Sequence, residues 1–369
     1  MKLSINKICT ALVIGMSTIS AGAYAARGGN YGDGDCCDFQ FGCGEWSAGV
    51  SALYWTAKED GLAYGAKLSE EPVDATTPSL VSFEDDVKYK NFDFDWNIGY
   101  RVNIDYLTTS QINFGLEYTH FNTRAKGHGN SEGTLGDGGE LFFPTYVTSN
   151  DFVIDADTGT GFDGHVKLDI DYIDATVGRE FQCVKCATVT PFVGARFARV
   201  DQKYHSVSTS TNFAGLTETD TETLTMNNQF DGAGLRGGLA TKWNLGNSVS
   251  FFGLAAISAL WGEHKVTYDD TITGIGGGLG ATTTLLNDSH QKDTYQAFRG
   301  ITDLAVGFTY DWEFCDSNVL EVSLAWEHHL FFNMNRFEEN GLQNNLTAAQ
   351  HSRGDLGTSG VTVGLNYAF

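Results

Sequence analysis

Long stretches of the chain alternate strictly between apolar and polar residues, and this feature restricts the fold most. From Phe92 to Tyr106 every second residue is aromatic or aliphatic, and the residues between them are Asp, Asn, Gly or Arg. A period of two places all the apolar side chains on one face of a β-strand. The stretch is much longer than an ordinary strand of about 5 to 6 residues. The pattern therefore predicts a long strand with one face in an apolar medium.

The same pattern recurs along the chain. Further alternating or strand-like stretches lie at 46–56, 112–118, 166–172, 188–201, 228–243, 248–262, 304–312, 320–326 and 361–369. After 166–172 we expect the phase of the alternation to slip near Ile173, as it does at a β-bulge. A hidden hairpin at 141–147 or 151–155 would add two strands to those named. We therefore expect about ten to twelve strands.

Short and long connections alternate between these stretches. Short turns lie at 107–111, 182–187, 244–247 and 313–317, and long segments rich in Gly, Asp and Thr lie at 57–91, 123–165, 202–227, 263–295 and 335–357. Short periplasmic turns and long extracellular loops are typical of outer-membrane barrels. A soluble β-sandwich has no reason to segregate its loops by length. The sequence thus predicts an all-β fold, a transmembrane antiparallel up-and-down β-barrel at 46–369.

Residues 1–25 have the features of a secretory signal peptide. Lys2 and Lys7 give a basic start, residues 11–16 are apolar, and small residues precede a cleavage site after Ala25. The Cys- and Gly-rich segment at 26–45 is expected to lie in the periplasm. The most apolar later stretch, at 251–262, is too short for a membrane helix, which needs about 18 residues or more. We expect export to the bacterial outer membrane.

Composition and motifs exclude other functions. The net charge of −23 argues against a nucleic-acid partner, which needs basic surface, and 41% hydrophobic residues argue against disorder. The G-x-S-x-G match at 129–133 lies in a glycine-rich loop, and His328 and His329 face opposite sides of a strand. We therefore expect no enzyme activity, no metal site and no cofactor.

Charged residues of both signs fall on the inferred inward faces of the strands. Charged side chains are disfavoured opposite lipid, so such an interior is either wet or salt-bridged. One interpretation is an aqueous channel whose charges tune ion passage. The other is a small barrel filled by its own ion pairs. The pore-lining candidates are Arg101, Lys167, Arg196, Arg236, Arg299, Asp95, Glu117, Asp169, Asp303, Glu321 and Glu327.

Apart from Cys9 in the signal peptide, the cysteines all fall on the predicted periplasmic side. They are Cys36, Cys37, Cys43, Cys183, Cys186 and Cys315. An exported protein meets oxidising conditions, so we expect disulfides, either at the barrel base or between molecules. A redox or zinc site at Cys183-x-x-Cys186 is the weaker alternative, because no second ligand pair accompanies it.

The last strand ends in Phe369, with Tyr367 and Leu365 on the same face. This end is similar to the C-terminal signal that the barrel-assembly machinery of Gram-negative bacteria reads. Together with the closing strand, four segments resemble the Legionella-type major outer membrane protein family, whose relatives also occur among environmental chlamydiae. These segments are 46–54 (WSAGVSALY), 112–121 (INFGLEYTHF), 191–199 (PFVGARFAR) and 230–238 (FDGAGLRGG). The resemblance spans most of the mature chain.

The resemblance implies a pore-forming, cysteine-containing surface protein that is often oligomeric and disulfide-linked. We therefore expect an outer-membrane porin that passes small hydrophilic solutes and ions by passive diffusion. The alternative is a non-conducting structural or adhesive barrel, disulfide-linked in the envelope, that works through its loops. Expected partners are outer-membrane lipid, the barrel-assembly machinery and further copies of the chain, a trimer being one arrangement. Disulfide-linked envelope proteins are further candidate partners.

Overall fold

The computed structural model describes residues 45–69, 87–131, 140–146, 158–184, 186–212, 218–275, 283–314, 318–340, 349–351 and 354–369. These residues form β-strands and turns, and no helix in the described part is long and apolar enough to cross a membrane. The main strands are β1 (Glu45–Glu59), β5 (Asn97–Leu107), β6 (Ile112–Asn130), β8 (Thr158–Arg179), β10 (Ala187–Asn212), β11 (Glu218–Gly246), β12 (Val249–Ile275), β13 (Thr283–Glu313), β14 (Val319–Asn335) and β17 (Gly354–Ala368).

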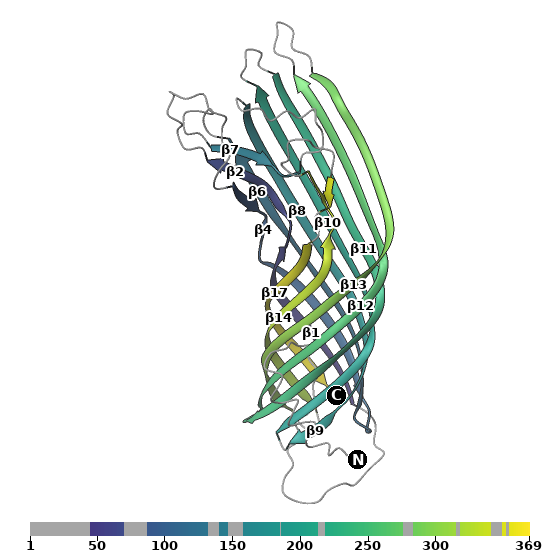
Figure 1. Cartoon of the computed structure of the whole chain (residues 1–369). Coiled ribbons are helices and arrows are strands. Elements are labelled where there is room, and N and C mark those ends of the chain that lie inside the picture. The colour runs from purple at the N-terminus through teal and green to yellow at the C-terminus, as the bar shows by residue number, and fades with distance from the viewer. Residues whose placement is uncertain are drawn as a thin grey trace, which may run out of the picture.

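These strands form one closed antiparallel barrel (Figure 1). The ring runs β11–β12–β13–β14–β17–β1–β5–β6–β8–β10, and the pairing of β10 with β11 closes it, which gives a barrel of ten strands. The short strands β4 (Asp93–Phe94) and β9 (Phe181–Val184) add local pairings. The predicted fold class is confirmed, at the lower end of the expected strand number.

The part of the barrel nearer the short turns, which we call the lower barrel, has an apolar outer surface bordered by aromatic rings. Near the short turns the rings of Trp46 and Tyr106 lie 4.7 Å apart, and further along β1 the rings of Tyr54 and Trp96 stack at 5.2 Å. Between these levels exposed apolar side chains such as Val50 face outward. Two aromatic girdles around an apolar zone are typical of the lipid-facing surface of an outer-membrane barrel. We call this zone the lipid-facing band.

The periplasmic end of the barrel holds the short turns and the C-terminus. In the β11–β12 hairpin, Asn247 and Ser248 have φ values of 53° and 63°. Positive φ at both central residues is the geometry of a two-residue type I′ hairpin turn. Leu365, Tyr367 and Phe369 are exposed on the outer face of this end. Their role as an assembly signal stays a prediction.

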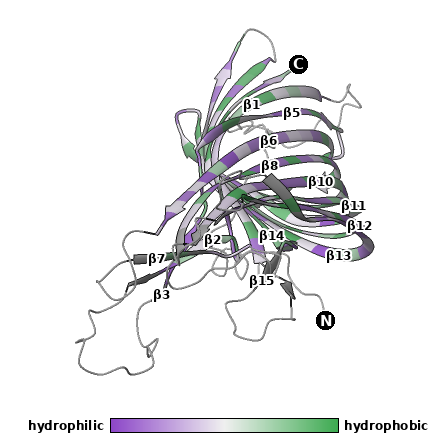
Figure 2. Ribbon diagram, turned by 90° about the horizontal axis from the view of Figure 1, so that it is seen from above, coloured by the Kyte–Doolittle hydropathy of each residue, from purple (hydrophilic) through white to green (hydrophobic). Residues whose placement is uncertain are grey.

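The face of the strand that carries the apolar side chains changes along the tall strands, from the outer face in the band to the inner face above it. β8 illustrates this hydropathy inversion. In the lipid-facing band Ile173 points outward and Asp174 is buried inside, whereas above the band Leu168 and Ile170 are buried inside and Asp169 faces out. The pairing of β8 with β6 and β10 shows no register shift here, so the expected bulge at Ile173 is wrong. The surroundings change instead, because lipid outside the lower barrel gives way to water outside the upper barrel. Hydrophobic and hydrophilic residues alternate along the barrel ribbons in Figure 2.

Three predicted pore-lining residues therefore lie on the outer surface. Lys167 and Asp169 are on β8 above the inversion and face outward. Asp95 is exposed in the break between β4 and β5, where Phe94 still faces the interior and Trp96 already faces outward. The prediction assumed that apolar residues face outward along every strand. It fails above the lipid-facing band, since water there favours polar side chains on the outer surface.

The barrel extends well beyond the band on the side opposite the short turns. β13 is 31 residues long, whereas a strand needs about 9 to 11 residues to cross a membrane. The strands β10 to β13 rise as a tall wall, and β14, β17 and β1 end lower (Figure 1). Much of the predicted loops at 202–227 and 263–295 is thus strand. Their many Thr residues are β-branched and suit a strand, which the prediction overlooked.

An apolar core fills the interior of this extension. A second sheet, in the order β3 (Val87–Asn91), β2 (Ala63–Ser69), β7 (Glu140–Pro144), contributes Tyr64, whose ring stacks on Phe162 at 5.5 Å. Tyr204 and Phe337 are buried in the same core. The sequence predicts a hidden hairpin at 141–147 or 151–155. Among the described residues of the first range the structure has the single strand β7, which pairs with β2 and adds nothing to the barrel, and 151–155 lie outside the described residues. A last small sheet pairs β15 (Glu338–Asn340) with β16 (Ala349–His351).

Several predictions concern residues outside the described part of the chain. They are the signal peptide at 1–25, the segment at 26–44, and Cys36, Cys37, Cys43 and Cys315. Cys183 belongs to β9, but its side chain lies outside the description. Cys186 is exposed and forms no disulfide with a described residue. The disulfides therefore stay a prediction.

The hydropathy inversion predicts that one substitution has two different costs on one strand. Ile257 is 68% exposed in the lipid-facing band of β12, and Thr271 faces outward above it. Ile257→Arg should destabilise the protein folded in lipid vesicles by about 2 to 4 kcal/mol, because it places a charge in hydrocarbon. Thr271→Arg, the matched control, should cost less than about 1 kcal/mol. Equal costs in urea-dependent folding would contradict the position of the band.

Candidate functional site

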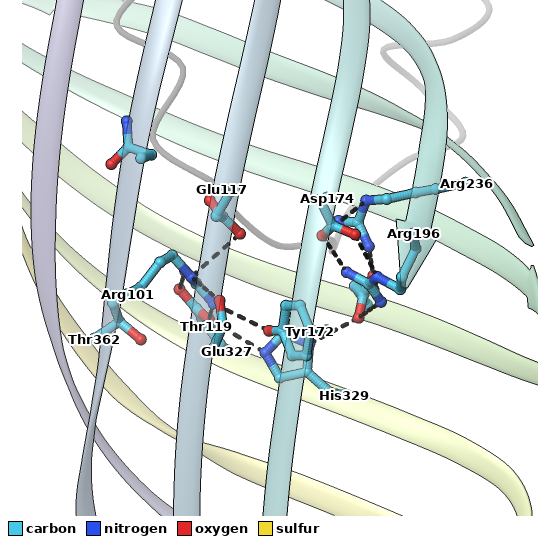
Figure 3. A network of polar contacts seen from close by, with 12 residues as sticks. Arg101, Glu117, Thr119, Tyr172, Asp174, Arg196, Arg236, Glu327, His329 and Thr362 are labelled. Atoms are coloured by element: carbon cyan, nitrogen blue, oxygen red, sulfur yellow. Dashed lines mark hydrogen bonds and ion pairs between the residues drawn. The ribbon is translucent and has the colours of Figure 1, made fainter. Parts of the chain in front are cut away.

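A layer of mostly charged, largely buried side chains crosses the barrel interior within the lipid-facing band (Figure 3). Each member occupies an inward position whose neighbours along the strand face outward, so the alternation and the strand register bring them together. The members come from β5, β6, β8, β10, β11, β13 and β14. We call them the ion-pair layer: Arg101, Glu117, Tyr172, Asp174, Arg196, Arg236, Asp303, Glu327 and His329.

Arg101 and Glu327 form one centre of the layer. The Arg101 guanidinium donates from Nη1 to Glu327 Oε1 at 2.9 Å and from Nη2 to Oε2 at 2.8 Å. This two-point geometry is the strong form of an arginine–carboxylate pair. Arg101 Nε donates to Thr119 Oγ1 at 3.0 Å and lies 3.3 Å from Glu117 Oε1. Arg101 therefore has two carboxylates within reach.

Two arginines and two aspartates form the other centre. Arg196 donates from Nε and Nη2 to the two oxygens of Asp174, both at 2.6 Å, and its Nη1 lies 2.9 Å from Asp303 Oδ2. Arg236 Nη1 donates to the same Asp303 oxygen, and its Nε lies 3.6 Å from Asp174. The guanidinium of Arg196 also lies 4.4 Å from the ring centroid of Tyr172. Each charge in this centre is thus matched by an opposite charge.

His329 joins the two centres. Its Nδ1 lies 2.8 Å from Asp303 Oδ1 and its Nε2 lies 3.2 Å from Glu327 Oε2. Both neighbours are carboxylates, which accept hydrogen bonds, so an imidazolium with a proton on each nitrogen satisfies the geometry. With that proton, the three arginines and His329 balance the four carboxylates of the layer. Charges persist in a membrane protein interior when they are paired in this way.

The side chains of the layer close the interior at that level. On the periplasmic side of the layer, the interior side chains are more exposed. The side chains of Arg196, Asp303 and Glu327 are only 1% to 2% exposed. Glu117 faces the same interior but is 21% exposed, and Asp105 below it is also partly exposed. Solvent therefore reaches the interior on the periplasmic side of the layer. We call this space, between the layer and the short turns, the periplasmic vestibule.

A second ion-pair group lies nearer the periplasmic end. Lys242 Nζ donates to Glu321 Oε2 at 2.8 Å and to Asp311 Oδ2 at 3.2 Å. Lys242 is one residue from Trp243, which lies beside Phe251 at the lower end of the band. The interior charges of the band are thus organised as two separate groups, one at each end of the vestibule.

The predicted pore-lining residues that do face the interior divide into three sets. Arg101, Glu117, Arg196, Arg236, Asp303 and Glu327 meet in the ion-pair layer, Glu321 pairs near the periplasm, and Arg299 faces the interior above the layer. The sequence prediction missed Tyr172, Asp174 and His329. Asp174 follows the outward Ile173. With apolar residues taken to face outward, an alternation counted from Ile173 would have placed it inside, whereas one counted from Leu168 and Ile170 would not. Within the described residues, no group of three or more His, Cys, Asp or Glu side chains could hold a metal ion.

Breaking the layer should be far more costly than breaking a similar pair on the surface. Arg196 faces the layer, and Arg199 on the same strand pairs with Asp231 on the outer face at 2.5 Å. Arg196→Met should reduce the free energy of unfolding by roughly 3 to 5 kcal/mol, because buried carboxylates lose their partner. Arg199→Met should cost at most about 1 kcal/mol. Urea-dependent unfolding in detergent micelles measures both; equal losses would show that the layer is not desolvated.

Comparisons with known proteins identify relatives of this barrel. The family model of the Legionella pneumophila major outer membrane protein precursor matches residues 42–369. No curated protein sequence matches the chain. Similar solved structures include the outer membrane protease OmpT from Escherichia coli, with 9% identity, a TM-score of 0.40 and coverage of 88% of this chain and 96% of that one.

The Pseudomonas putida toluene transporter TodX has 9% identity, a TM-score of 0.25 and coverage of 88% of this chain and 89% of that one. A FadL homologue from Pseudomonas aeruginosa has 8% identity, a TM-score of 0.23 and coverage of 89% and 90%. Structural similarity this low gives no argument about function. The family match instead covers all described residues. The chain belongs to the family of the Legionella pneumophila major outer membrane protein.

Proposed function

We propose that the protein is a pore-forming outer-membrane barrel, closed at rest, that passes small ions and hydrophilic solutes when the ion-pair layer rearranges. The observation that supports this proposal is the charged interior within the lipid-facing band. Buried ion pairs stabilise a protein no better than well-packed apolar side chains of similar volume. A purely structural barrel could fill the same positions with apolar residues. Charges that can separate and re-pair are better suited to a gate.

Arg101 is the group best placed to move. Its guanidinium lies between Glu327, which is almost fully buried, and Glu117, which is partly exposed to the vestibule. Moving from Glu327 to Glu117 would keep the guanidinium paired while it frees the carboxylate that holds His329. The two arrangements therefore differ in which part of the interior is blocked, without leaving the arginine unpaired.

A non-conducting structural barrel is the second candidate function. The observation that favours it is the apolar core of the extension, where Tyr204, Phe230 and Phe337 are at most 1% exposed. A solute that crosses the barrel would have to displace this core as well as the ion-pair layer. In that case the extension and its loops would be the working surface. Neither candidate requires a catalytic residue.

Planar-bilayer recordings of the full refolded chain separate the two candidates. For a pore we expect stepwise currents that are infrequent in the unmodified protein. Glu327→Gln should raise the open fraction several-fold, because Arg101 loses its bidentate partner and turns to Glu117. Glu263→Gln alters a carboxylate on the outer face of β12 and is the matched control, with no change expected. Silence from both the unmodified protein and Glu327→Gln would reject the pore and support the structural barrel.

A pore through the vestibule should also depend on the charge of Glu117. Glu117→Gln should shift the reversal potential in a KCl gradient toward lower cation preference, because a carboxylate beside the path attracts cations. Asp163→Asn changes an exposed carboxylate above the band and serves as the control. An unchanged reversal potential in Glu117→Gln would place the conducting path elsewhere.

A further inference from the structure

Two arginines at the base of the extension have no acidic partner among the described residues. Arg299 on β13 is 6% exposed, and Arg336 directly follows β14. Neither guanidinium has a described carboxylate oxygen within 4.0 Å. Arg299 Nη2 and Arg336 Nε are buried nitrogens without a hydrogen-bond partner in the described part of the chain. This contrasts with the ion-pair layer, where each guanidinium contacts two carboxylates.

A chain of neutral groups holds Arg299 in place without balancing its charge. Arg299 Nε donates to His264 Nε2 at 2.9 Å, and since arginine only donates, His264 accepts there and carries its proton on Nδ1. His264 Nδ1 then donates to Asn228 Oδ1 at 3.1 Å. Asn228 Nδ2 donates to Gln202 Oε1 at 2.5 Å and to Met334 O at 2.8 Å. Every acceptor in this series of hydrogen bonds is uncharged.

The protonation of the nearby groups leaves the positive charge uncompensated. His264 lies above the lipid-facing band, between Glu263 and Lys265, which pair on the outer face. Burial and the charges of Arg299 and Arg336 lower the pKa of His264 to about 3, so it is neutral at pH 7. At the other end of this series of hydrogen bonds, Gln202 donates to Glu59, which lies in the extension. Burial raises the pKa of Glu59 to about 8, so this carboxyl is also largely neutral.

The outer surface beside the two arginines is apolar and includes a free sheet edge. Trp261 and Phe298 are exposed at the upper rim of the lipid-facing band, and Phe332 is exposed close by. The pairing of β13 with β14 ends at Ile301 opposite Phe331. Above that point β12 is the only described partner of β13. Arg299 therefore lies where an amphiphile at the membrane surface could place its headgroup beside an open edge.

We propose that Arg299 and Arg336 form a binding site for a phosphate group at the outer rim of the lipid-facing band. The planar guanidinium is suited to phosphate, because parallel N–H donors match two phosphate oxygens. Two free donors on neighbouring cations supply the contacts that the described protein residues leave unfilled, and a buried unpaired donor is costly without a ligand. The phosphate can belong to a lipid headgroup or to a soluble phosphate. This site does not depend on whether the barrel conducts.

Calorimetric titration of the full refolded chain in zwitterionic detergent micelles tests the site. The probes are inorganic phosphate and lipid A, a glycolipid whose headgroup carries phosphate. Arg299→Gln and Arg336→Gln should each weaken binding at least tenfold, and Lys265→Gln, a cation on the outer face at the same height, should change it less than twofold. Lipid A binding at least tenfold tighter than inorganic phosphate identifies the headgroup as the ligand. Comparable binding of both identifies a soluble phosphate.

Two results would overturn the site. One is the absence of binding of either probe to the unmodified protein. The other is binding that Arg299→Gln and Arg336→Gln leave unchanged. If Arg299→Gln fails to fold, as heat-modifiable migration in electrophoresis would reveal, Arg336→Gln decides the outcome, because Arg336 is only partly buried. Arg299→Lys keeps the charge but loses the planar fork, so it should retain part of the affinity.

Discussion

Closure of the β-sheet into a ring is the constraint on which the rest of the structure depends. β1 pairs with β17 from Ser47 opposite Ala368 to Glu59 opposite Leu356. At the periplasmic end, Trp46 N donates to Phe369 O at 3.1 Å and Phe369 N donates to Trp46 O at 2.9 Å. Within lipid every backbone donor and acceptor must be satisfied inside the protein, and a closed ring achieves this without a free edge.

A ring of ten strands also decides what its interior can contain. It encloses little space, so inward side chains from strands that are not neighbours come into contact. This explains why Arg101 on β5 reaches Glu327 on β14, far away in the sequence. The interior is consequently closed at the ion-pair layer and apolar above it. The proposed pore therefore requires that paired charges exchange partners, since the described side chains of the layer are almost fully buried at that level.

Two surroundings along one strand explain the pattern of side chains. Around the lower barrel, lipid favours apolar residues outside and leaves charged residues for the interior. Around the extension, water favours polar residues outside. The interior there is an apolar core like that of an ordinary soluble protein. The same strand, β10, therefore carries Arg196 inside and Phe197 outside in the band, but Val200 inside and Asp201 outside above it. The boundary between these regimes is also where Arg299 has no counter-charge among the described residues.

By itself the sequence determined the fold class, because alternation over long stretches and the segregation of short turns leave few architectures other than an outer-membrane barrel. It also identified Arg101, Arg196, Arg236, Asp303 and Glu327 as interior charges. Only the tertiary structure decided which of these charges meet, since strand register and barrel size bring distant residues together. It alone placed Asp95, Lys167 and Asp169 outside, because hydropathy alternation shows that two faces differ but does not show which face meets lipid, water or core.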